Sequence, residues 1–540
     1  MLHLNSQLKN LIDKLWDKFW SGGISNPLTA IEQITYLIFM KRIDELDFKR
    51  KADAEWNGEE YKSLFDGVFP EPTEEEKGKI ANGEEDKVIR IKKEQLRWSK
   101  FSHLKAEEML DLISQFVFPF LKELNGKNSH FTKHMKNAVF IIPSPLLLVE
   151  AIKIIELIFK EIEKDSLENG QAFQDIQGDV YEHLLSEIAS SGKNGQFRTP
   201  RHIINLLVDL VEPKYGDKIA DPACGTGGFL LGAYQYILTT LDRDKKHSVT
   251  DENGFIRSTK SALLTEGKKQ VIAKFFRGYD IDVTMVRLGI MNLMMHGIDD
   301  PNIDYTDTLS KSFQKYSDEQ GSYDVVLANP PFTGNLNKGE IDDTLTLNTT
   351  KTELLFIDRI YSMLRDGGTA GIIIPQGVLF SRAKAFVDTR KIMIENSQLK
   401  AVITMPSGVF KPYAGVSTAI IIFTKTNGHK NEKVWFYDMQ NDGYTLNDNR
   451  TPCDGSDIPD ILERFKNLEN ETKRARTDKS FFVPIDEIEK ADFDLSINRY
   501  KETVYETISY DAPTKILEDL EKINSKISLG LEELKELINE

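Results

Sequence analysis

The chain has 540 residues, of which 40% are hydrophobic and 29% charged, and this composition predicts a soluble globular protein with several structural units. No apolar run approaches the roughly 18 residues that a membrane-spanning helix needs. The N-terminus lacks a secretion-signal pattern, and the two cysteines, Cys224 and Cys453, are too few for a disulfide framework. We therefore expect a cytoplasmic protein. Its formal net charge of −16 argues against extensive contacts with nucleic-acid phosphates, unless basic groups cluster locally or a partner supplies them.

The first 165 residues carry the periodicity of amphipathic helices. Over residues 2–48, apolar side chains recur at steps of three and four residues, and they include Leu4, Leu8, Leu11, Leu15 and Phe19. Similar patterns return near residues 104–124 and 145–163, whereas residues 71–97 are highly charged and poorly periodic, which favours a loop. We therefore predict an N-terminal all-α domain over residues 1–165.

From about residue 200, short strand-like apolar runs alternate with helical patterns. The runs are residues 218–220, 324–327, 371–374, 401–403 and 419–423. This alternation predicts an α/β domain, residues 166–430, in which helices cover a mostly parallel sheet. Residues 431–510 show a mixed pattern, and we assign them to an extension of that domain.

The last segment, residues 511–540, predicts a C-terminal helical tail. Its apolar stripe, with Glu and Lys between the members, consists of Ile516, Leu520, Ile523, Ile527, Leu531, Leu534 and Ile538. Gly530 is expected to weaken this helix. The periodicity alone is equally typical of a helix that docks on a partner and of one that folds onto its own domain.

The first motif for a ligand site runs from Asp221 to Phe229, Asp-Pro-Ala-Cys-Gly-Thr-Gly-Gly-Phe, directly after a strand-like run. Glycines in a strand-to-helix turn let the backbone approach a ligand, and the helix N-terminus offers free N–H groups. A carboxylate at the strand end favours a cationic or hydroxyl-bearing ligand, although a tight turn without a ligand would use the same glycines. The candidate binding residues are Asp221, Ala223, Gly225, Thr226 and Gly227.

The second motif, Gly278-Tyr279-Asp280-Ile281-Asp282, places the Asp280 carboxylate at the end of the next strand. An acidic residue at this position commonly binds ribose hydroxyls, usually about 20 residues after the glycine turn. Here the spacing is longer because a polar segment around residues 241–270 intervenes. A surface carboxylate or a helix cap therefore remains an alternative interpretation of Asp280.

The third motif, Asn329-Pro330-Pro331-Phe332, ends a strand-like run. The two prolines predict a rigid, non-helical turn, which would hold the Asn329 side chain and the Pro330 carbonyl in place. Both groups can accept hydrogen bonds from an exocyclic amino group, and Phe332 offers a flat face on which a base could stack. The alternative is a structural turn with a core phenylalanine.

The three motifs in this order resemble the gamma class of amino-methyltransferases. Further segments match the modification subunits of type I restriction–modification systems, the HsdM family, and the resemblance extends over nearly the whole chain. These segments are Gly178–Leu185, Gly195–Pro200, Pro375–Phe380, Met405–Phe410 and Asp442–Tyr444. The family often has Tyr at the position of Arg198 and Glu at that of Asp280.

The resemblance implies a Rossmann-like core that uses S-adenosylmethionine as its cofactor, with an N-terminal all-α domain and a helical tail. Phe197 and Thr199 would lie against the cofactor, Asp221 and Gly225 would contact its methionine part, Asp280 its ribose, and Asp307 would sit near its adenine ring. Asn329, Pro330, Pro331 and Phe332 would form the catalytic loop that grips the target adenine.

The function that the resemblance implies is site-specific DNA adenine-N6 methylation, in which a methyl group passes from S-adenosylmethionine to an adenine flipped out of double-stranded DNA. The implied partners are a specificity subunit, one per two modification subunits, and in some systems a restriction or translocase subunit. The stripe in residues 511–540 is then a candidate for docking on a subunit.

Three other functions compete with this one. A methyltransferase for protein glutamine or RNA guanine carries a similar Asn-Pro-Pro-aromatic loop, but such enzymes are usually compact and lack a long N-terminal helical domain. A self-contained restriction enzyme would need a nuclease motif and its own recognition domain, and the sequence shows neither. A non-catalytic assembly subunit would not need the intact segment from Asn329 to Phe332.

The sequence offers one weak candidate for a metal site. His130 and His134 are spaced so that one face of a helix could bear both. No further nearby His, Cys or carboxylate completes the three or four ligands that zinc usually requires, so we expect no metal.

Overall fold

The computed structural model describes the chain except for residues 1–5, 83–87, 125, 127–128, 170–198, 243, 245–247, 252, 259–263, 265, 299, 413, 503–511 and 540. The described residues fall into two compact units, Met1–Tyr500 and Lys501–Glu540. Within the described residues, no helix combines the length and the apolar character that crossing a membrane requires.

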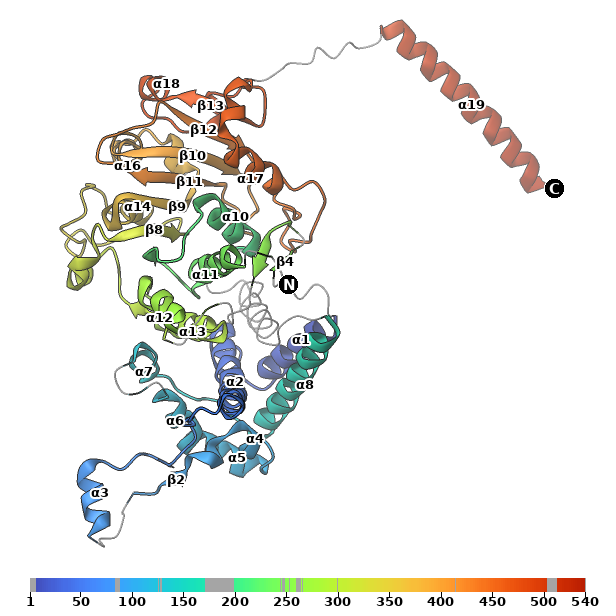
Figure 1. The fold of residues 1–540 in the computed structure, drawn as a ribbon. Helices are drawn as coiled ribbons and strands as arrows, with labels where there is room; N and C mark the ends of the chain where they lie inside the picture. The colour runs from blue at the N-terminus through green and yellow to red at the C-terminus, as the bar shows by residue number, and fades with distance from the viewer. Residues whose placement is uncertain are drawn as a thin grey trace. The chain divides into compact units, whose positions relative to one another are not determined.

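Helices pack around an apolar core in the N-terminal region (Figure 1). They are α1 (Ser6–Ser21), α2 (Pro27–Asn57), α4 (Trp98–Phe101), α5 (Ala106–Leu112), α6 (Phe118–Lys122), α7 (His130–Met135) and α8 (Pro145–Asn169), whereas α3 (Glu74–Ala81) lies to one side of them (Figure 1). Helix α1 buries Leu8, Leu15 and Phe19 of the predicted stripe, because the three-and-four spacing puts them on one helical face. The helical character predicted for this region is confirmed.

The loop expected over residues 71–97 is wrong for part of its length. Helix α3 forms there because Thr73 and Glu76 make a capping box. The Glu76 carboxylate accepts hydrogen bonds from the Thr73 amide at 2.8 Å and the Thr73 hydroxyl at 3.0 Å, and the Thr73 hydroxyl accepts one from the Glu76 amide at 3.3 Å. Two short strands, β1 (Val68–Phe69) and β2 (Ile91–Lys92), pair on either side of the helix.

A nine-stranded sheet forms the centre of the following region. In spatial order its strands are β13 (Ser480–Pro484), β12 (Lys433–Asp438), β10 (Ser397–Met405), β11 (Thr418–Lys425), β9 (Leu364–Pro375), β8 (Tyr323–Ala328), β3 (Ile219–Asp221), β6 (Phe276–Asp280) and β7 (Ile303–Tyr305). Neighbours run parallel from β9 to β7 and between β10 and β12, whereas β11 and β13 are antiparallel to their neighbours. The predicted α/β fold with a mostly parallel sheet is confirmed. Strands β12 and β13, whose sequence pattern is mixed, extend one edge of the sheet.

Helices cover both faces of this sheet (Figure 1). They are α10 (Arg201–Val211), α11 (Gly228–Leu241), α12 (Glu266–Phe275), α13 (Val283–Met295), α14 (Thr352–Met363), α15 (Gly377–Phe380), α16 (Lys384–Glu395), α17 (Ile458–Lys466) and α18 (Ile485–Lys490). A separate two-stranded pair is formed by β4 (Ser248–Thr250) and β5 (Ile256–Ser258).

The two faces of the sheet belong to two different cores. On β8, Val325 and Leu327 contribute to the core that contains α10, α11 and α13, whereas Val326 and Ala328 contribute to the core that contains α14 and α16. This follows from the alternation of side chains along a strand. The first core also contains the N-terminal helices, so the helical region and the sheet share one continuous apolar interior within Met1–Tyr500.

The second unit contains helix α19 (Pro513–Asn539), which continues through Gly530. The members of the predicted stripe are all about half exposed or more within the described residues, from Ile516 at 46% to Ile538 at 74%. This exposure leaves an apolar face that α19 itself cannot cover.

Candidate functional site

A pocket of about 1000 Å³ opens at the carboxyl ends of four adjacent parallel strands, β3, β6, β7 and β8. Loops that follow neighbouring parallel strands meet at one edge of the sheet, so motifs far apart in the sequence converge there. The pocket is lined by these predicted residues: Thr199, Asp221, Ala223, Gly225, Thr226, Asp280, Asp307, Asn329 and Pro331. The structure does not place Gly227, Pro330 or Phe332 in that lining, and Phe197 lies outside the described residues.

The glycine turn between β3 and α11 has a backbone that only glycine adopts readily. Gly225 and Gly227 have φ of +51° and +76°, in the left-handed region. Gly227 is the N-terminal cap of α11 and shapes the turn without lining the pocket. Gly289 of α13 lets that helix approach the turn, because a Cβ there would lie 3.1 Å from the carbonyl oxygen of Gly225.

Two carboxylates lie in the floor of the pocket. Asp221 is 1% exposed, and burial together with the nearby Asp280 charge raises its pKa to about 8. Burial also raises the pKa of Asp280, although the amides of Asp282 and Gly225 donate hydrogen bonds to its oxygens at 2.9 and 2.8 Å. Two buried acids that lack a cationic partner among the described residues disfavour their own ionised forms. The floor is therefore complementary to a ligand that carries positive charge and hydroxyl groups.

Asn329 provides an available acceptor in the same pocket. Its Nδ2 donates a hydrogen bond to the Thr199 hydroxyl at 2.9 Å, which fixes the orientation of the amide. Its Oδ1 is buried and has no hydrogen-bond partner in the part of the chain that the structure describes. A buried acceptor without a partner costs about 1–3 kcal/mol, a penalty that a ligand N–H would remove.

Phe332 occupies a different place from the one expected for a stacking ring. The side chain is 3% exposed and packs edge-to-face against Phe410, with ring centroids 5.4 Å apart. In this structure the ring belongs to the core, as the alternative interpretation holds, and its stacking on a base stays a prediction. The exposed ring in the lining is that of Tyr305, at the end of β7, which is 53% exposed.

The opposite wall of the pocket comes from a segment that sequence reasoning missed. Residues 333–336 fold back on residues 350–352, and the amide of Thr352 donates a hydrogen bond to the Gly334 carbonyl at 3.1 Å. Thr352 lines the pocket, and its buried hydroxyl has no partner among the described residues. Gly334, two residues after the Asn-Pro-Pro-Phe segment, was the available signal, because a Cβ at this position would lie 2.5 Å from that hydroxyl.

A buried arginine supports the remaining wall. Arg359 is fully buried, pairs with Asp342 and donates a hydrogen bond from Nε to the Thr308 carbonyl at 2.7 Å. The Thr308 hydroxyl in turn donates to the carbonyl of Pro222, in the glycine turn, at 3.1 Å. Asp307 precedes this link and accepts a hydrogen bond from the Leu309 amide at 2.9 Å. These hydrogen bonds therefore connect α14, through Thr308, to the turn that follows β3.

Comparison with protein families gives two matches in the order of the chain. Residues 172–507 match the model of the family described as N-6 DNA Methylase, and residues 8–155 match the HsdM N-terminal domain. The first match contains the three motifs that line the pocket, and the second covers most of the N-terminal helices.

Individual relatives are similar over most of this chain. The type I restriction enzyme EcoEI methylase subunit of Escherichia coli is 28% identical over 444 residues, which cover 80% of this chain and 83% of the relative. Among solved structures, a modification subunit of a putative type I restriction enzyme from Vibrio vulnificus YJ016 has a TM-score of 0.64 at 20% identity, covering 89% of this chain and 93% of the other. A chain from a type I R-M system studied for complex assembly and conformational transition has a TM-score of 0.65 at 24% identity, covering 99% and 98%. These structural likenesses establish the shared fold.

Proposed function

This chain belongs to the N-6 DNA methylase family and is a DNA adenine methyltransferase, and from that premise we propose how it works: it transfers a methyl group from S-adenosylmethionine to N6 of an adenine flipped out of duplex DNA. The observation that carries the proposal is the unpartnered Oδ1 of Asn329, which shares one pocket with the buried carboxylates of Asp221 and Asp280 within the described residues.

The floor of the pocket fits S-adenosylmethionine by charge. Asp221 and the backbone at Gly225 would hold the ammonium end of its methionine part, Asp280 its ribose hydroxyls, and Asp307 the side near its adenine ring. The cofactor, when bound, supplies a methyl group on a positively charged sulfur. A cation next to Asp221 stabilises the carboxylate that burial disfavours, so cofactor binding and ionisation of Asp221 support each other.

The catalytic loop would act on the amino group of the adenine. Asn329 Oδ1 and the Pro330 carbonyl would accept hydrogen bonds from the two N–H groups, which would position the nitrogen and stabilise the positive charge that develops on it. Thr199 keeps the amide in the orientation that presents oxygen rather than nitrogen to the base. Unstacking the base costs a few kcal/mol, which contacts in the pocket must offset.

Thr199→Val is expected to slow methylation roughly tenfold. This change in rate corresponds to about the net free energy of one hydrogen bond. Valine keeps the shape of threonine but removes the acceptor for Asn329 Nδ2, so the amide can rotate. The measurement is kcat with DNA, together with the Kd for S-adenosylmethionine. Thr199→Ser restores the hydroxyl and should recover most of kcat. A valine variant that changes only cofactor affinity would show that Thr199 does not position Asn329.

A methyltransferase for protein glutamine or RNA guanine is not favoured. The chain matches a DNA methylase family over residues 172–507 and the HsdM N-terminal domain over residues 8–155.

As the modification subunit of a type I restriction–modification system, the chain would work within a complex. We propose that two copies bind one specificity subunit, which selects the DNA sequence, and that a restriction or translocase subunit joins the complex in some systems. A partner that contacts DNA also accounts for the net charge of −16. The exposed stripe of α19 is the proposed docking face, and the cytoplasm, where the DNA lies, is the proposed location.

The test compares the isolated chain with the chain plus its specificity subunit. We expect the isolated chain to bind the cofactor but to methylate duplex DNA poorly, and we expect the added subunit to restore methylation at one bipartite sequence. Release factor and ribosomal RNA serve as competing substrates. Efficient methylation of either competitor, or site-specific methylation of DNA by the isolated chain, would contradict the proposal.

A further inference from the structure

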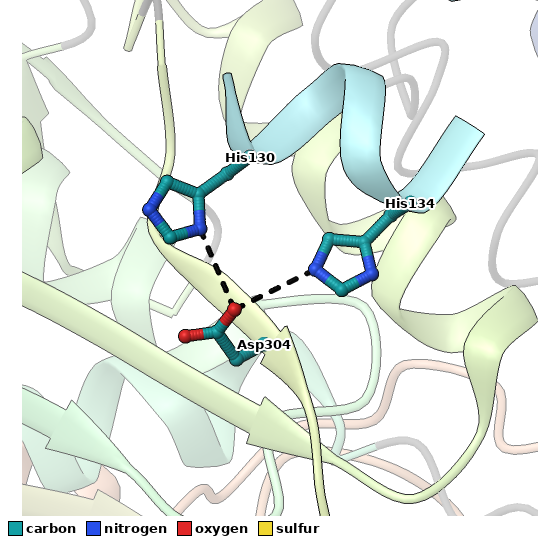
Figure 2. A group of neighbouring side chains, drawn as sticks. All are labelled: His130, His134 and Asp304. Atoms are coloured by element: carbon teal, nitrogen blue, oxygen red, sulfur yellow. Dashed lines mark ion pairs between the residues drawn. The ribbon is translucent and has the colours of Figure 1, made fainter. Parts of the chain in front are cut away.

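Three side chains from two distant parts of the chain converge outside the pocket (Figure 2). His130 and His134 project from the same face of α7, and Asp304 lies in the middle of β7, the edge strand of the sheet. The expectation that no carboxylate lies near the two histidines is therefore wrong. The third group comes from a strand far along the chain, which the spacing of the histidines could not reveal.

The distances among these groups are those of shared ligands rather than of hydrogen bonds. Asp304 Oδ1 lies 3.5 Å from His130 Nδ1 and 3.6 Å from His134 Nε2, beyond the usual 2.7–3.2 Å of a hydrogen bond. Both ring nitrogens are buried and have no hydrogen-bond partner within the described ranges. Two ligands on one tetrahedral zinc ion, each bound at about 2.0–2.2 Å, lie roughly 3.4 Å apart. The two distances to Asp304 match this spacing, and all three ligand atoms lie within 4.8 Å of one another.

We propose that His130, His134 and Asp304 bind one divalent transition-metal ion, with zinc as the preferred ion. The set of two imidazoles and one carboxylate suits zinc, which takes nitrogen and oxygen ligands in tetrahedral geometry. The side chains are 25%, 13% and 14% exposed, so a water molecule can reach the fourth position. The harder ions Mg²⁺ and Ca²⁺ prefer sites made of oxygen alone.

Tyr316, in the 3₁₀ helix η5 (Lys311–Glu319), lies close to the Asp304 carboxylate. A protonated hydroxyl beside a metal-binding carboxylate orients it as an outer-shell donor does.

The position of the site indicates a structural role. Tyr305 and Asp307, which follow Asp304 closely along the chain, line the cofactor pocket, whereas α7 belongs to the N-terminal helices. A metal ion would fix the edge strand of the pocket to the helical region. The buried ion pair between Glu32 of α2 and Arg287 of α13, 2.6 Å apart, makes a second link between the same two regions.

The experiment titrates the full chain, stripped of metal with a chelator, with Zn²⁺ against a chromogenic competitor, and it measures bound metal per chain and the melting temperature. We expect one zinc per chain and a higher melting temperature with zinc. In His134→Gln and Asp304→Asn, affinity should fall at least tenfold, since loss of even an outer-shell partner costs about 10–100-fold. His103→Ala, which removes an exposed histidine of the helical region, should bind zinc like the unaltered chain.

A second readout does not depend on the folding of any variant. Co²⁺ bound to the unaltered chain should show the intense visible absorption of tetrahedral coordination, and Zn²⁺ should displace it. The proposal is overturned if the unaltered chain binds zinc without one-to-one stoichiometry, if cobalt shows only the weak octahedral spectrum, or if folded His134→Gln and Asp304→Asn bind zinc as tightly as His103→Ala.

Discussion

Asn329→Ala is expected to lower the rate of DNA methylation by roughly 10²–10³-fold, the usual loss when one preorganised hydrogen-bonding group that acts on a developing charge is removed. The side chain offers the pocket a buried oxygen that no described residue bonds, and its nitrogen is already bonded to Thr199. Alanine therefore removes an acceptor that the substrate amino group would use, while the carboxylates of Asp221 and Asp280 remain in place.

The measurement is single-turnover methylation by the complex with its specificity subunit, alongside cofactor binding by calorimetry. Cofactor affinity and assembly should stay within about threefold of the unaltered chain, a change of less than about 1 kcal/mol. Asn337→Ala is the matched control, because Asn337 is an exposed asparagine of the same connection between β8 and α14 and does not line the pocket. Near-normal methylation by Asn329→Ala would refute the catalytic role of the loop.

Asp221→Asn should weaken cofactor binding strongly and remove its pH dependence. In the ligand-free chain the pKa of Asp221 is about 8, and a cationic ligand favours the ionised form. Affinity for S-adenosylmethionine should therefore increase as pH rises toward about 8 and level off above it. The neutral amide cannot ionise, so the variant should bind weakly at every pH in this window. Calorimetric titrations at pH values on either side of about 8 measure the effect.

Although Asp221→Asn should weaken cofactor binding, it should stabilise the ligand-free chain near pH 8. Because the pKa of Asp221 is raised from an ordinary value of 3.8 in the unfolded chain, the folded state binds the proton more tightly, and stability falls as pH rises from about 4 to about 8. The amide in Asp221→Asn would not carry this penalty, so the ligand-free variant should melt at a higher temperature near pH 8 than the unaltered chain does. Asp343→Asn, at a 75% exposed carboxylate, is the control.

The binding prediction has its own contradicting outcome. If Asp221→Asn binds S-adenosylmethionine with unchanged affinity, or if its affinity keeps the same pH dependence, Asp221 does not meet the cofactor's charge.

The positions of the main predicted site residues followed from local patterns. Asp221, Asp280 and Asn329 each come directly after an apolar strand-like run, and carboxyl ends of neighbouring parallel strands meet at one edge. Period and order along the chain were enough to place them together, because a parallel sheet converts sequence order into a shared edge. The buried face of α1 could be predicted for a similar reason, because the spacing of residues along one helix decides which of them share a face.

Contacts between elements could be read only from the folded chain. Thr199 reaches Asn329 across 130 residues, and Asp304 meets His134 because an edge strand lies against a short helix. Phe332 illustrates the same limit, because a ring after two prolines can face a pocket or a core, and packing against Phe410 decides which. The sequence by itself determined the type of fold and the residues at the ends of its strands, since hydrophobic period and backbone restriction act locally. Tertiary structure decided which side chains contact one another, because the distances between side chains of separate elements depend on how those elements pack.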